Sequence, residues 1–414
     1  MANIGFQGLG KLGAPVAYTF ASRGHEVFGY DTNPEVVQYL EAGYYPHREE
    51  GMPELMAENH VTIVKSIGEL VSQSDMIFVP VQTPHEPEYE GSTRLPEERK
   101  DFDYTHLTKA IGELATECET QKKHTDIVII STTLPGTVDR EIKPLLNEYT
   151  HLAYEPMFIA MGTVVEDVLN PEFTLIGVDE PDVADRLEAV HKMVHNAPAL
   201  RTDITTAEAI KVSYNTFITT KTVLGNLWGE IAHKTGANVD DIYKAWSLST
   251  DRLISPKYLK SGVGDGGGCH PRDNIALSWL AEQSDLSFNY FDALMKAREL
   301  HMEWIAGLAQ EAAEKEALPI FILGESFKPE TRITTGSPAV LLKNILAEDS
   351  EVTVLPEPQL PTEKGVYVIG VEHEMYKSVV FPDGSVCIDP FRFVKPREGV
   401  EYIQIGLTGN PNSI

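Results

Sequence analysis

The sequence predicts an α/β fold in which two doubly wound domains are joined by a central helical region with a long helix. This fold class is predicted by two regions in which strand and helix patterns alternate and by one mainly helical region between them. Residues 1–204 and 317–414 alternate short β-branched runs with amphipathic stretches, whereas residues 205–316 are mainly helical in pattern. Strands that alternate with helices favour right-handed βαβ units and parallel sheets covered on both faces. We therefore expect three domains with these boundaries.

The expected elements follow in chain order. In the first region we expect strands at 2–7, 26–30, 61–64, 76–81 and 127–131, and helices at 14–23, 34–42 and 104–118. The long helix starts near Thr205 and is apolar on most of its circumference, which is typical of a buried helix or a subunit interface. Further helices are expected at 275–283 and 291–316. The last region predicts strands at 320–324, 352–355 and 366–371 and a helix at 338–346.

Composition excludes several classes of partner. At 414 residues, with a net charge of −28, the chain lacks the basic surface that nucleic acid and anionic membranes require. No run of about 18 apolar residues predicts a membrane span, and Met1 leads into a strand rather than a signal peptide. The cysteines, Cys118, Cys269 and Cys387, are far apart in sequence and suggest no disulfide framework. We expect a cytoplasmic protein in which Cys118 and Cys387 are packing residues.

A glycine-rich turn follows the first strand and opens the first helix. It matches G-x-G-x-x-G with Gly8, Gly10, Lys11, Leu12 and Gly13. The glycines permit a tight turn and close approach of a pyrophosphate, which the helix N-terminus stabilises. Asp31 ends the second strand, 18 residues after Gly13, where a carboxylate binds ribose hydroxyls and repels a 2′-phosphate. These residues predict a Rossmann-like domain that binds NAD rather than NADP; the alternative is a glycine-rich turn that serves another ligand.

Hydroxyl groups follow two further strands. Thr83 comes after the strand at 76–81, and Thr132 belongs to the segment 131–137 after the strand at 127–131. Both are expected beside the cofactor, because the carboxyl ends of parallel strands form the ligand edge of such sheets. Hydroxyls there bind phosphate, ribose or a reacting water. Serine and threonine in loops also simply satisfy the local backbone, so both interpretations stay open.

A second glycine-rich stretch, 262–268, leads directly into Cys269. Arg272 and Asp273 follow within one helical turn. A thiol beside a cation at a helix start has a lowered pKa, which favours the nucleophilic thiolate. The alternative is a surface turn with an incidental cysteine.

Lys211 and Asn215 stand four residues apart on the long helix and therefore share a face. A buried lysine is unfavourable unless paired, so Lys211 is expected to point into a site, where it stabilises an oxyanion. It could instead reach solvent or pair with Glu208. Among the histidines, only His191 and His195 have close spacing, and no third ligand is near, so no metal site is expected.

Taken together, these motifs resemble the UDP-glucose/GDP-mannose dehydrogenase family over nearly the whole chain. They occur in family order: G-x-G-x-x-G at 8–13, S-T-x-x-P-G-T at 131–137, A-x-K…N at 209–215, G-x-G-x-G-G-x-C…D at 262–273, F-K-P-x-T…S-P-A at 327–339, and E-H-E-M-Y at 372–376 where the family has E-W-D-x-F. The resemblance implies two Rossmann-like domains around a central helical domain that forms a homodimer. It also implies oxidation of the C6 alcohol of a nucleotide sugar to a carboxylate with two NAD⁺.

The resemblance assigns roles to individual residues. Cys269 is implied as the nucleophile that forms a thiohemiacetal and then a thioester, Asp273 and Lys211 as groups that manage protons and the oxyanion, and Thr132 as a group that positions water. Asn215 is implied to orient the substrate. The implied substrate contacts are Lys211, Asn215, Arg252, Gly266, Arg272 and Lys328.

Several positions depart from the family pattern. Both glutamates of N-P-E-F-L-x-E-G are replaced, by Met157 and Met161, and Glu155 nearby is expected to point elsewhere. An arginine of T-D-D-x-R-x-S-P is missing at Thr335 or Gly336. Two alternatives remain beside a nucleotide-sugar dehydrogenase. One is a β-hydroxyacid dehydrogenase with a single hydride transfer, because residues 8–14 followed by Pro15 also resemble the opening motif of that family. The other is a nucleotide-sugar-binding homologue that lost turnover with the two glutamates.

Overall fold

The computed structural model describes residues 2–84, 97, 100–255, 257, 261–264 and 270–407. The chain forms two compact units, Met1–Thr220 and Lys221–Ile414. Helix α8 (Ile204–Thr235) begins in the first unit and ends in the second. Among the described residues, no helix is both long enough and apolar enough to cross a membrane.

The first unit is built on an eight-stranded sheet in the order β3-β2-β1-β4-β5-β6-β7-β8. The strands are β1 (Asn3–Gln7), β2 (Glu26–Tyr30), β3 (Thr62–Ile63), β4 (Met76–Val79), β5 (Thr125–Ile129), β6 (Thr150–Tyr154), β7 (Thr174–Val178) and β8 (Ala199–Thr202). All neighbours pair in parallel except β6 and β7, which are antiparallel. The expectation of a wholly parallel sheet is therefore wrong at this one pair.

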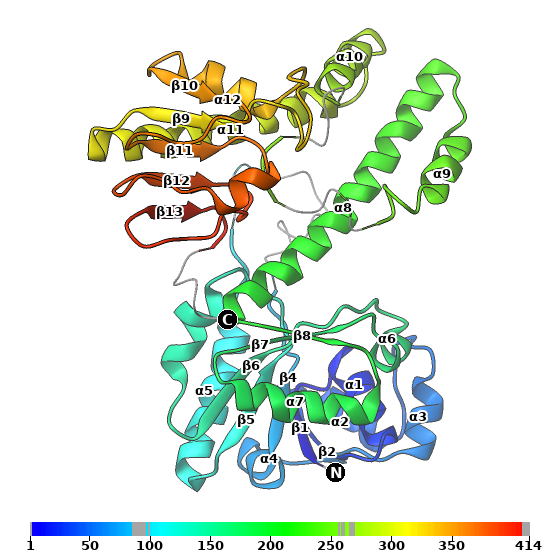
Figure 1. Ribbon diagram of the computed structural model, residues 1–414. Helices are drawn as coiled ribbons and strands as arrows, with labels where there is room; N and C mark the ends of the chain where they lie inside the picture. The colour runs from blue at the N-terminus through cyan, green and yellow to red at the C-terminus, as the bar shows by residue number, and fades with distance from the viewer. Residues whose placement is uncertain are drawn as a thin grey trace. The chain divides into compact units, whose positions relative to one another are not determined.

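Helices cover both faces of this sheet (Figure 1). They are α1 (Gly13–Ser22), α2 (Pro34–Glu41), α3 (Met52–Glu58), α4 (Ile67–Gln73), α5 (Thr105–Gln121), α6 (Val164–Leu169) and α7 (Pro181–Val194), with short turns η2 (Val138–Ile142) and η3 (Lys143–Leu145). Alternate residues of β4 divide between two cores, since Phe78 packs with α1 and α7 while Ile77 packs with α4 and α5. This alternation is what a strand buried on both faces requires.

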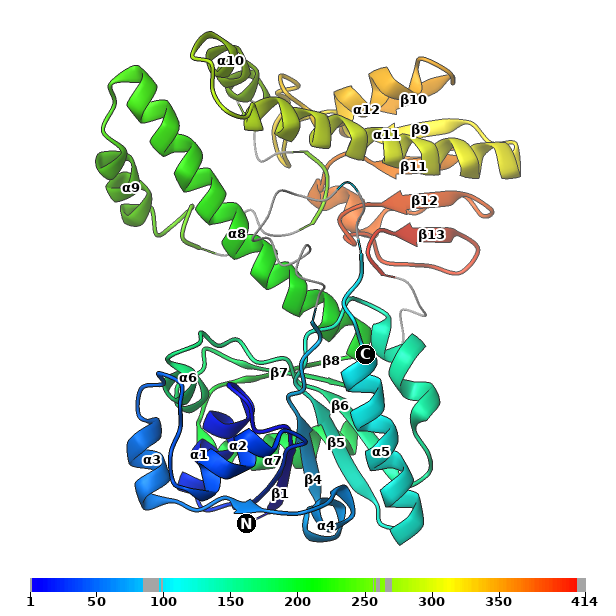
Figure 2. The same cartoon turned by 180° about the vertical axis from the view of Figure 1, so that it is seen from behind.

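The second unit contains a five-stranded, wholly parallel sheet in the order β10-β9-β11-β12-β13. Its strands are β9 (Ile320–Leu323), β10 (Val352–Leu355), β11 (Val366–Ile369), β12 (Val386–Asp389) and β13 (Glu401–Gln404). Helices α11 (Tyr290–Glu316) and α12 (Pro338–Leu346) pack on one face (Figure 2). Tyr376, in the turn η4 (Glu374–Ser378), packs on the other.

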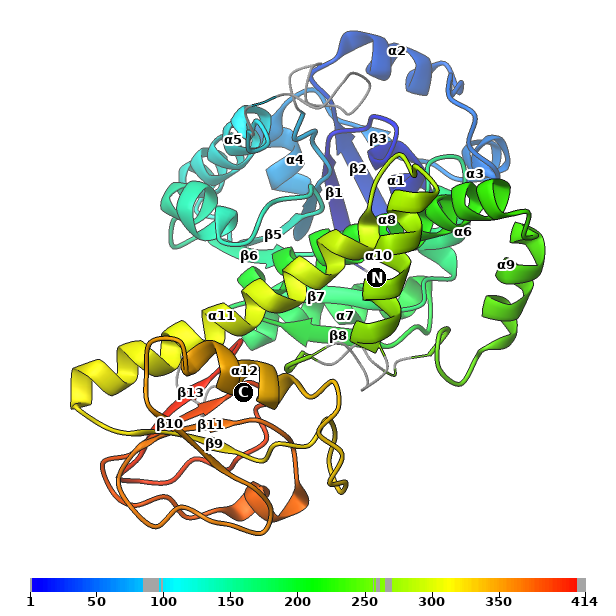
Figure 3. The same ribbon diagram turned by 90° about the horizontal axis from the view of Figure 1, so that it is seen from above.

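Two further helices complete the second unit, α9 (Val239–Leu248) and α10 (His270–Gln283). The end of α8 packs against α10 and the start of α11 through Leu227, Ile231, Ala281 and Phe291 (Figure 3). Parallel sheets, covering helices and a central helical segment confirm the predicted fold class. The three-domain division at 204 and 316 stays a prediction.

Candidate active site

An open cavity of about 610 Å³ lies at the carboxyl edge of the eight-stranded sheet. The loops after β1, β2, β4 and β5 meet there with the segment after β6 and with α8. Eight of the residues predicted from the sequence line it: Gly8, Gly10, Lys11, Leu12, Asp31, Thr83, Thr132 and Lys211. The structure therefore brings seven of the eight predicted cofactor residues, all but Gly13, and two predicted catalytic residues, Thr132 and Lys211, to a single site.

Each glycine of the glycine-rich loop meets a different structural requirement. Gly8 has a φ of +114°, a backbone conformation that other residues rarely adopt. A Cβ atom on Gly13 would lie 2.0 Å from the Gly8 carbonyl oxygen, so only glycine fits where the helix leaves the loop. A Cβ atom on Gly10 would meet no protein atom within 4 Å, so its free side faces open space. A pyrophosphate fits this arrangement because no side chain blocks it.

Asp31 has a structural role that the sequence analysis missed. Its Oδ2 atom accepts a 2.7 Å hydrogen bond from the Leu9 backbone N–H, and its Oδ1 atom accepts one of 2.8 Å from Asn33. The carboxylate thus connects the end of β2 to the glycine-rich loop. Carboxylate oxygens accept several hydrogen bonds, so Asp31 retains acceptor capacity for a ribose hydroxyl.

Lys211 lies beside Met157 at the inner wall of the cavity. Its Nζ atom donates a 2.7 Å hydrogen bond to the Met157 carbonyl oxygen and lies 4.9 Å from the centre of the Phe158 ring. Burial lowers the pKa of Lys211, because the charged form loses hydration. Lys211 thus lines the main cavity, and its role in a functional site stays a prediction.

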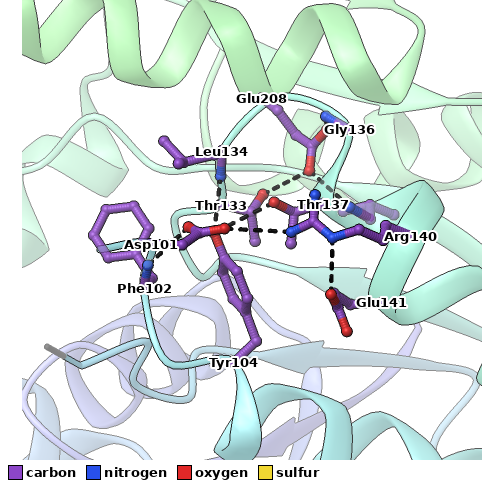
Figure 4. Close-up of polar contacts among 11 residues, drawn as sticks. Asp101, Phe102, Tyr104, Thr133, Leu134, Gly136, Thr137, Arg140, Glu141 and Glu208 are labelled. Carbon is purple, nitrogen blue, oxygen red and sulfur yellow. Dashed lines mark hydrogen bonds and ion pairs between the residues drawn. The ribbon is translucent and has the colours of Figure 1, made fainter. Parts of the chain in front are cut away.

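The alternative pairing of Lys211 with Glu208 is wrong. Glu208 is fully buried and accepts three hydrogen bonds from the segment that follows Thr132 (Figure 4). The donors are the Thr133 hydroxyl at 2.9 Å and the backbone N–H groups of Gly136 at 2.7 Å and Val138 at 2.9 Å. Burial raises the pKa of Glu208, and these hydrogen bonds oppose that shift. Helix α8 thereby fixes the loop that carries Thr132.

Tyr104 supports the same loop from the other side (Figure 4). Its hydroxyl donates to Asp101 at 2.6 Å and accepts from the Leu134 N–H and the Thr137 hydroxyl, both at 3.3 Å. Thr83 adds a further tie, because its hydroxyl donates to the Thr132 carbonyl oxygen at 3.0 Å. Sequence reasoning missed Glu208 and Tyr104 as supports; the available signal was an acidic residue within an apolar helical stretch.

The segment 155–159 separates this cavity from a smaller one of about 260 Å³. Met157 and Ile159 border both, whereas Glu155 borders only the smaller one. Glu155 is buried, with an oxygen 2.7 Å from the Nε2 atom of His191. As expected, Glu155 points away from the main cavity, so it does not replace the glutamates missing at 157 and 161.

The remaining predicted residues lie elsewhere in the chain. Asn215 is exposed on α8 and does not line the main cavity. In the second unit, Arg252 lies in an exposed turn after α9, Asp273 lies in the first turn of α10, and Lys328 is exposed in the loop after β9. Cys269, Gly266 and the Arg272 side chain lie outside the described residues; α10 begins at His270, the next residue after Cys269.

The two cysteines that the structure describes are both buried and free of disulfides. Burial raises the pKa of Cys118, and it raises that of Cys387 strongly. Both therefore remain thiols at neutral pH, as packing residues do.

Comparisons with known proteins agree on one family. Residues 2–195 match the NAD-binding domain of the UDP-glucose/GDP-mannose dehydrogenase family, and residues 205–299 match its central domain. A UDP-glucose 6-dehydrogenase of Bacillus subtilis is 25% identical over 94% of this chain and 83% of its own length. A GDP-mannose 6-dehydrogenase of Pseudomonas putida is 28% identical, over 86% and 80%. The crystal structure of a Pseudomonas aeruginosa GDP-mannose dehydrogenase has the same fold, with a TM-score of 0.86, 22% identity and coverage of 97% and 99%.

Proposed function

Because this chain belongs to the UDP-glucose/GDP-mannose dehydrogenase family, we propose that it oxidises the C6 hydroxyl of a nucleotide sugar to a carboxylate with NAD⁺. The substrate we propose is UDP-glucose or a closely similar UDP-sugar. The observation that carries this proposal is the main cavity, where the glycine-rich loop, Asp31, Thr132 and Lys211 meet. NAD⁺ supplies the hydride acceptor when bound. Gly8, Gly10, Gly13 and Asp31 would hold its pyrophosphate and ribose.

The chain's own groups divide the reaction into two oxidations. In the first, the C6 alcohol loses a proton and a hydride and becomes an aldehyde. The Cys269 thiolate then adds to this aldehyde, and loss of a second hydride from the adduct leaves a thioester. Water cleaves the thioester, which releases the carboxylate and the thiol. A soft nucleophile suits this sequence, because the aldehyde stays attached between the two hydride transfers.

Lys211 would act on the oxygen at C6. Its Nζ atom has three hydrogens when charged, and Met157 accepts only one of them. The others can donate to an alkoxide or oxyanion, whose negative charge a half-buried ammonium group stabilises well. Thr132, at the same cavity wall, would orient the attacking water, and Asp273 would manage its proton. Asn215, Arg252, Gly266, Arg272 and Lys328 would contact the substrate.

One observation favours a second candidate, a nucleotide-sugar-binding homologue without turnover. Met157 and Met161 both line the cavity at the positions where the family has glutamates. Methionine thioethers neither accept a proton from water nor stabilise a positive charge. Hydrolysis of the thioester would therefore proceed without a catalytic carboxylate at these two positions.

The test is the yield of NADH per nucleotide sugar, measured with UDP-glucose, UDP-galactose, UDP-N-acetylhexosamines and GDP-mannose. Two NADH per substrate with the wild type, and at most one with Cys269→Ser, would support the complete reaction. A burst of two NADH per active site, with the sugar held on Cys269 as a thioester, would mean that hydrolysis fails. One NADH per substrate would mean that oxidation stops at the aldehyde stage. Full turnover by Cys269→Ser would favour a single-hydride β-hydroxyacid-type enzyme. Binding of NADH and a UDP-sugar without reduction would support the second candidate.

The domain roles belong to the same proposal. Residues 1–204 would bind NAD, residues 205–316 would form a homodimer, and residues 317–414 would bind the nucleotide of the substrate. The middle of α8 supports a dimer contact, since the apolar side chains of Phe217, Ile218 and Val223 are each about half exposed in the single chain. Sedimentation velocity of wild type and Phe217→Glu tests it, and a wild-type monomer at micromolar concentration would contradict it.

A further inference from the structure

Three side chains converge at the carboxyl edge of the five-stranded sheet. Glu330 follows β9, Glu357 follows β10 and His373 follows β11, and these three strands are neighbours in the order β10-β9-β11. One ligand atom from each side chain lies within 4.8 Å of the other two. The carboxyl edge of a parallel sheet is where such folds bind ligands, so this convergence lies at a favourable place.

The hydrogen bonds of His373 determine which ring nitrogen carries a hydrogen. The Ser326 hydroxyl donates to the Lys328 carbonyl oxygen at 2.9 Å, so its oxygen is free to accept from Nε2 of His373, 3.1 Å away. The Glu330 backbone N–H points at Nδ1, at 3.1 Å, so Nδ1 presents a lone pair. A histidine that donates through one nitrogen and presents a lone pair on the other has the arrangement found in metal-binding histidines.

The charges around Nδ1 are unbalanced. Carboxylate oxygens of Glu330 and Glu357 lie 3.7 Å and 3.6 Å from it. With no hydrogen on Nδ1, three electron-rich atoms face one another, and His373 itself is only 1% exposed. In the part of the chain that the structure describes, neither carboxylate has an ion pair with a lysine or arginine. A cation between the three atoms would remove this repulsion.

The buried Tyr376 hydroxyl is a second, independent sign. Its side chain is fully buried and packs edge-on against the His373 ring, at 5.5 Å between centroids, yet its oxygen has no hydrogen-bond partner. A water molecule on a cation at this site would give the hydroxyl the partner that it lacks.

The distances suit a small divalent ion. Donor atoms bound tetrahedrally at about 2.1 Å from a metal are about 3.4 Å apart. The observed separations of 3.6 and 3.7 Å from Nδ1 therefore need only small movements of two glutamates, of which Glu330 is 63% exposed. One nitrogen and two carboxylates favour Zn²⁺ or Mn²⁺ over Mg²⁺, which prefers an octahedral shell of oxygens. When a metal binds Nδ1 of His373, the hydrogen bond from the Glu330 N–H to this nitrogen would break. The N–H group could then donate to water, since the loop is exposed.

We propose that Glu330, Glu357 and His373 bind a divalent transition-metal ion, with Zn²⁺ as the probe, and that this ion fixes the loop that carries Lys328. Sequence spacing predicts no metal site, because these three ligands come from three separate loops and are not close together in the sequence. Metal binding does not depend on the proposed function. Only the consequence for Lys328, a predicted substrate contact, rests on it.

The experiment uses the full chain with Cys269→Ser, without a histidine tag and after chelator treatment, so that the thiol of Cys269 does not compete for Zn²⁺. Isothermal titration calorimetry with Zn²⁺, Mn²⁺ and Mg²⁺ measures affinity and stoichiometry. We expect one Zn²⁺ per chain, with Mg²⁺ bound far more weakly. Glu330→Gln, Glu357→Gln and His373→Gln should each weaken Zn²⁺ binding by at least 30-fold. Glu374→Gln is the matched control, because Glu374 is an exposed neighbour that pairs with Lys377.

Thermal melts of the same proteins, with and without Zn²⁺, show whether each variant is folded and whether Zn²⁺ stabilises it. Zn²⁺ should raise the melting temperature of the parent and of Glu374→Gln but not that of the three ligand variants, because a ligand stabilises the state that binds it. Absence of stoichiometric Zn²⁺ binding, or binding that the three substitutions leave unchanged, would overturn the proposal. If the parent binds Zn²⁺ in this way but the wild-type chain produces no NADH from any of the nucleotide sugars, the proposed function is refuted and the metal site stands.

Discussion

The Nζ atom of Lys211 donates a 2.7 Å hydrogen bond to the backbone carbonyl of Met157, where the sequence resemblance predicts that the family has a glutamate. The contact uses the backbone at 157, so it survives the loss of the acidic side chain. Lys211 therefore keeps its place in the cavity wall although no carboxylate at 157 balances its charge. Its lowered pKa is the physical sign of that environment.

Lys211→Met should lower kcat by about 10²-fold or more, since a buried oxyanion donor contributes on that scale. The same substitution should raise stability at neutral pH. Burial lowers the pKa of Lys211 in the folded chain, so the unfolded chain binds the proton more tightly. The charged lysine therefore lowers the free energy of unfolding at neutral pH. This destabilisation becomes smaller as pH rises toward 10.5, because the folded chain loses the proton first. Initial rates of NADH formation and thermal melts at pH 7 and 9.5 test both parts. Activity within tenfold of wild type would contradict the assigned role.

Gly10→Ala and Gly13→Ala form a matched pair within one loop. The Gly10 variant should fold normally, because its Cβ meets nothing, but bind NAD⁺ about 10-fold or more weakly, the effect of one lost phosphate hydrogen bond. The Gly13 variant should lose about 3 kcal/mol of unfolding free energy, because its Cβ would overlap the Gly8 carbonyl. Urea unfolding and NAD⁺ titration by calorimetry measure the pair. Equal stability losses would show that the loop is not packed as described.

Glu208→Ala should destabilise the chain by about 3 kcal/mol, because three hydrogen bonds to a buried carboxylate are lost together. Thr133→Val removes only one of the three and should cost about 1 kcal/mol. Both variants should lower kcat more than they raise KM for NAD⁺, since the loop holds Thr132 rather than the nucleotide. Urea unfolding and steady-state kinetics distinguish this from a purely structural loss. A Glu208→Ala variant as stable as wild type would refute the network.

Stability should fall as pH falls from 6.5 toward 4, partly through His195. Burial, and then the charge of His191, lower its pKa from 6.5 to about 4. In this window the unfolded chain takes up a proton that the folded chain does not, so unfolding becomes easier. His195→Gln should flatten the dependence of unfolding free energy on pH between 7 and 5. Urea unfolding at several pH values measures it, and an unchanged slope would assign the dependence to other groups.

The elements that the sequence predicted best are those with a clear apolar pattern and a distinct boundary. Strand Glu26–Tyr30 and helix Pro338–Leu346 were predicted with the bounds observed, the helix being preceded by the Ser337 cap. The sequence pattern predicts no separate strands or helices in the region from β6 to β8, although β6 and β7 are largely buried. Strand β8 is half exposed, so its apolar pattern is too weak to predict a strand. Direction within a sheet depends on the connection and not on side-chain pattern, so the antiparallel β6–β7 pair was not predictable.

The candidate site shows the same division. The cofactor residues follow from local spacing, because a turn, a helix start and a strand end are all short-range features. Glu208 and the Glu330–Glu357–His373 group depend on chain segments that meet only in the folded state. The partners of Glu208 are 70 to 75 residues away, and Glu330 and His373 are 43 residues apart, which is beyond the reach of any periodicity.

The hydrogen bond from the Leu9 N–H to Asp31 has a thermodynamic consequence for the cofactor. It joins the glycine-rich loop to the neighbouring strand end by the chain's own groups, so the loop holds its shape before any nucleotide arrives. Little conformational entropy is then lost on association, and more of the contact energy becomes affinity. Asp31→Ala would release the loop, and the resulting penalty would extend to ligands that make no contact with the carboxylate, including inorganic pyrophosphate.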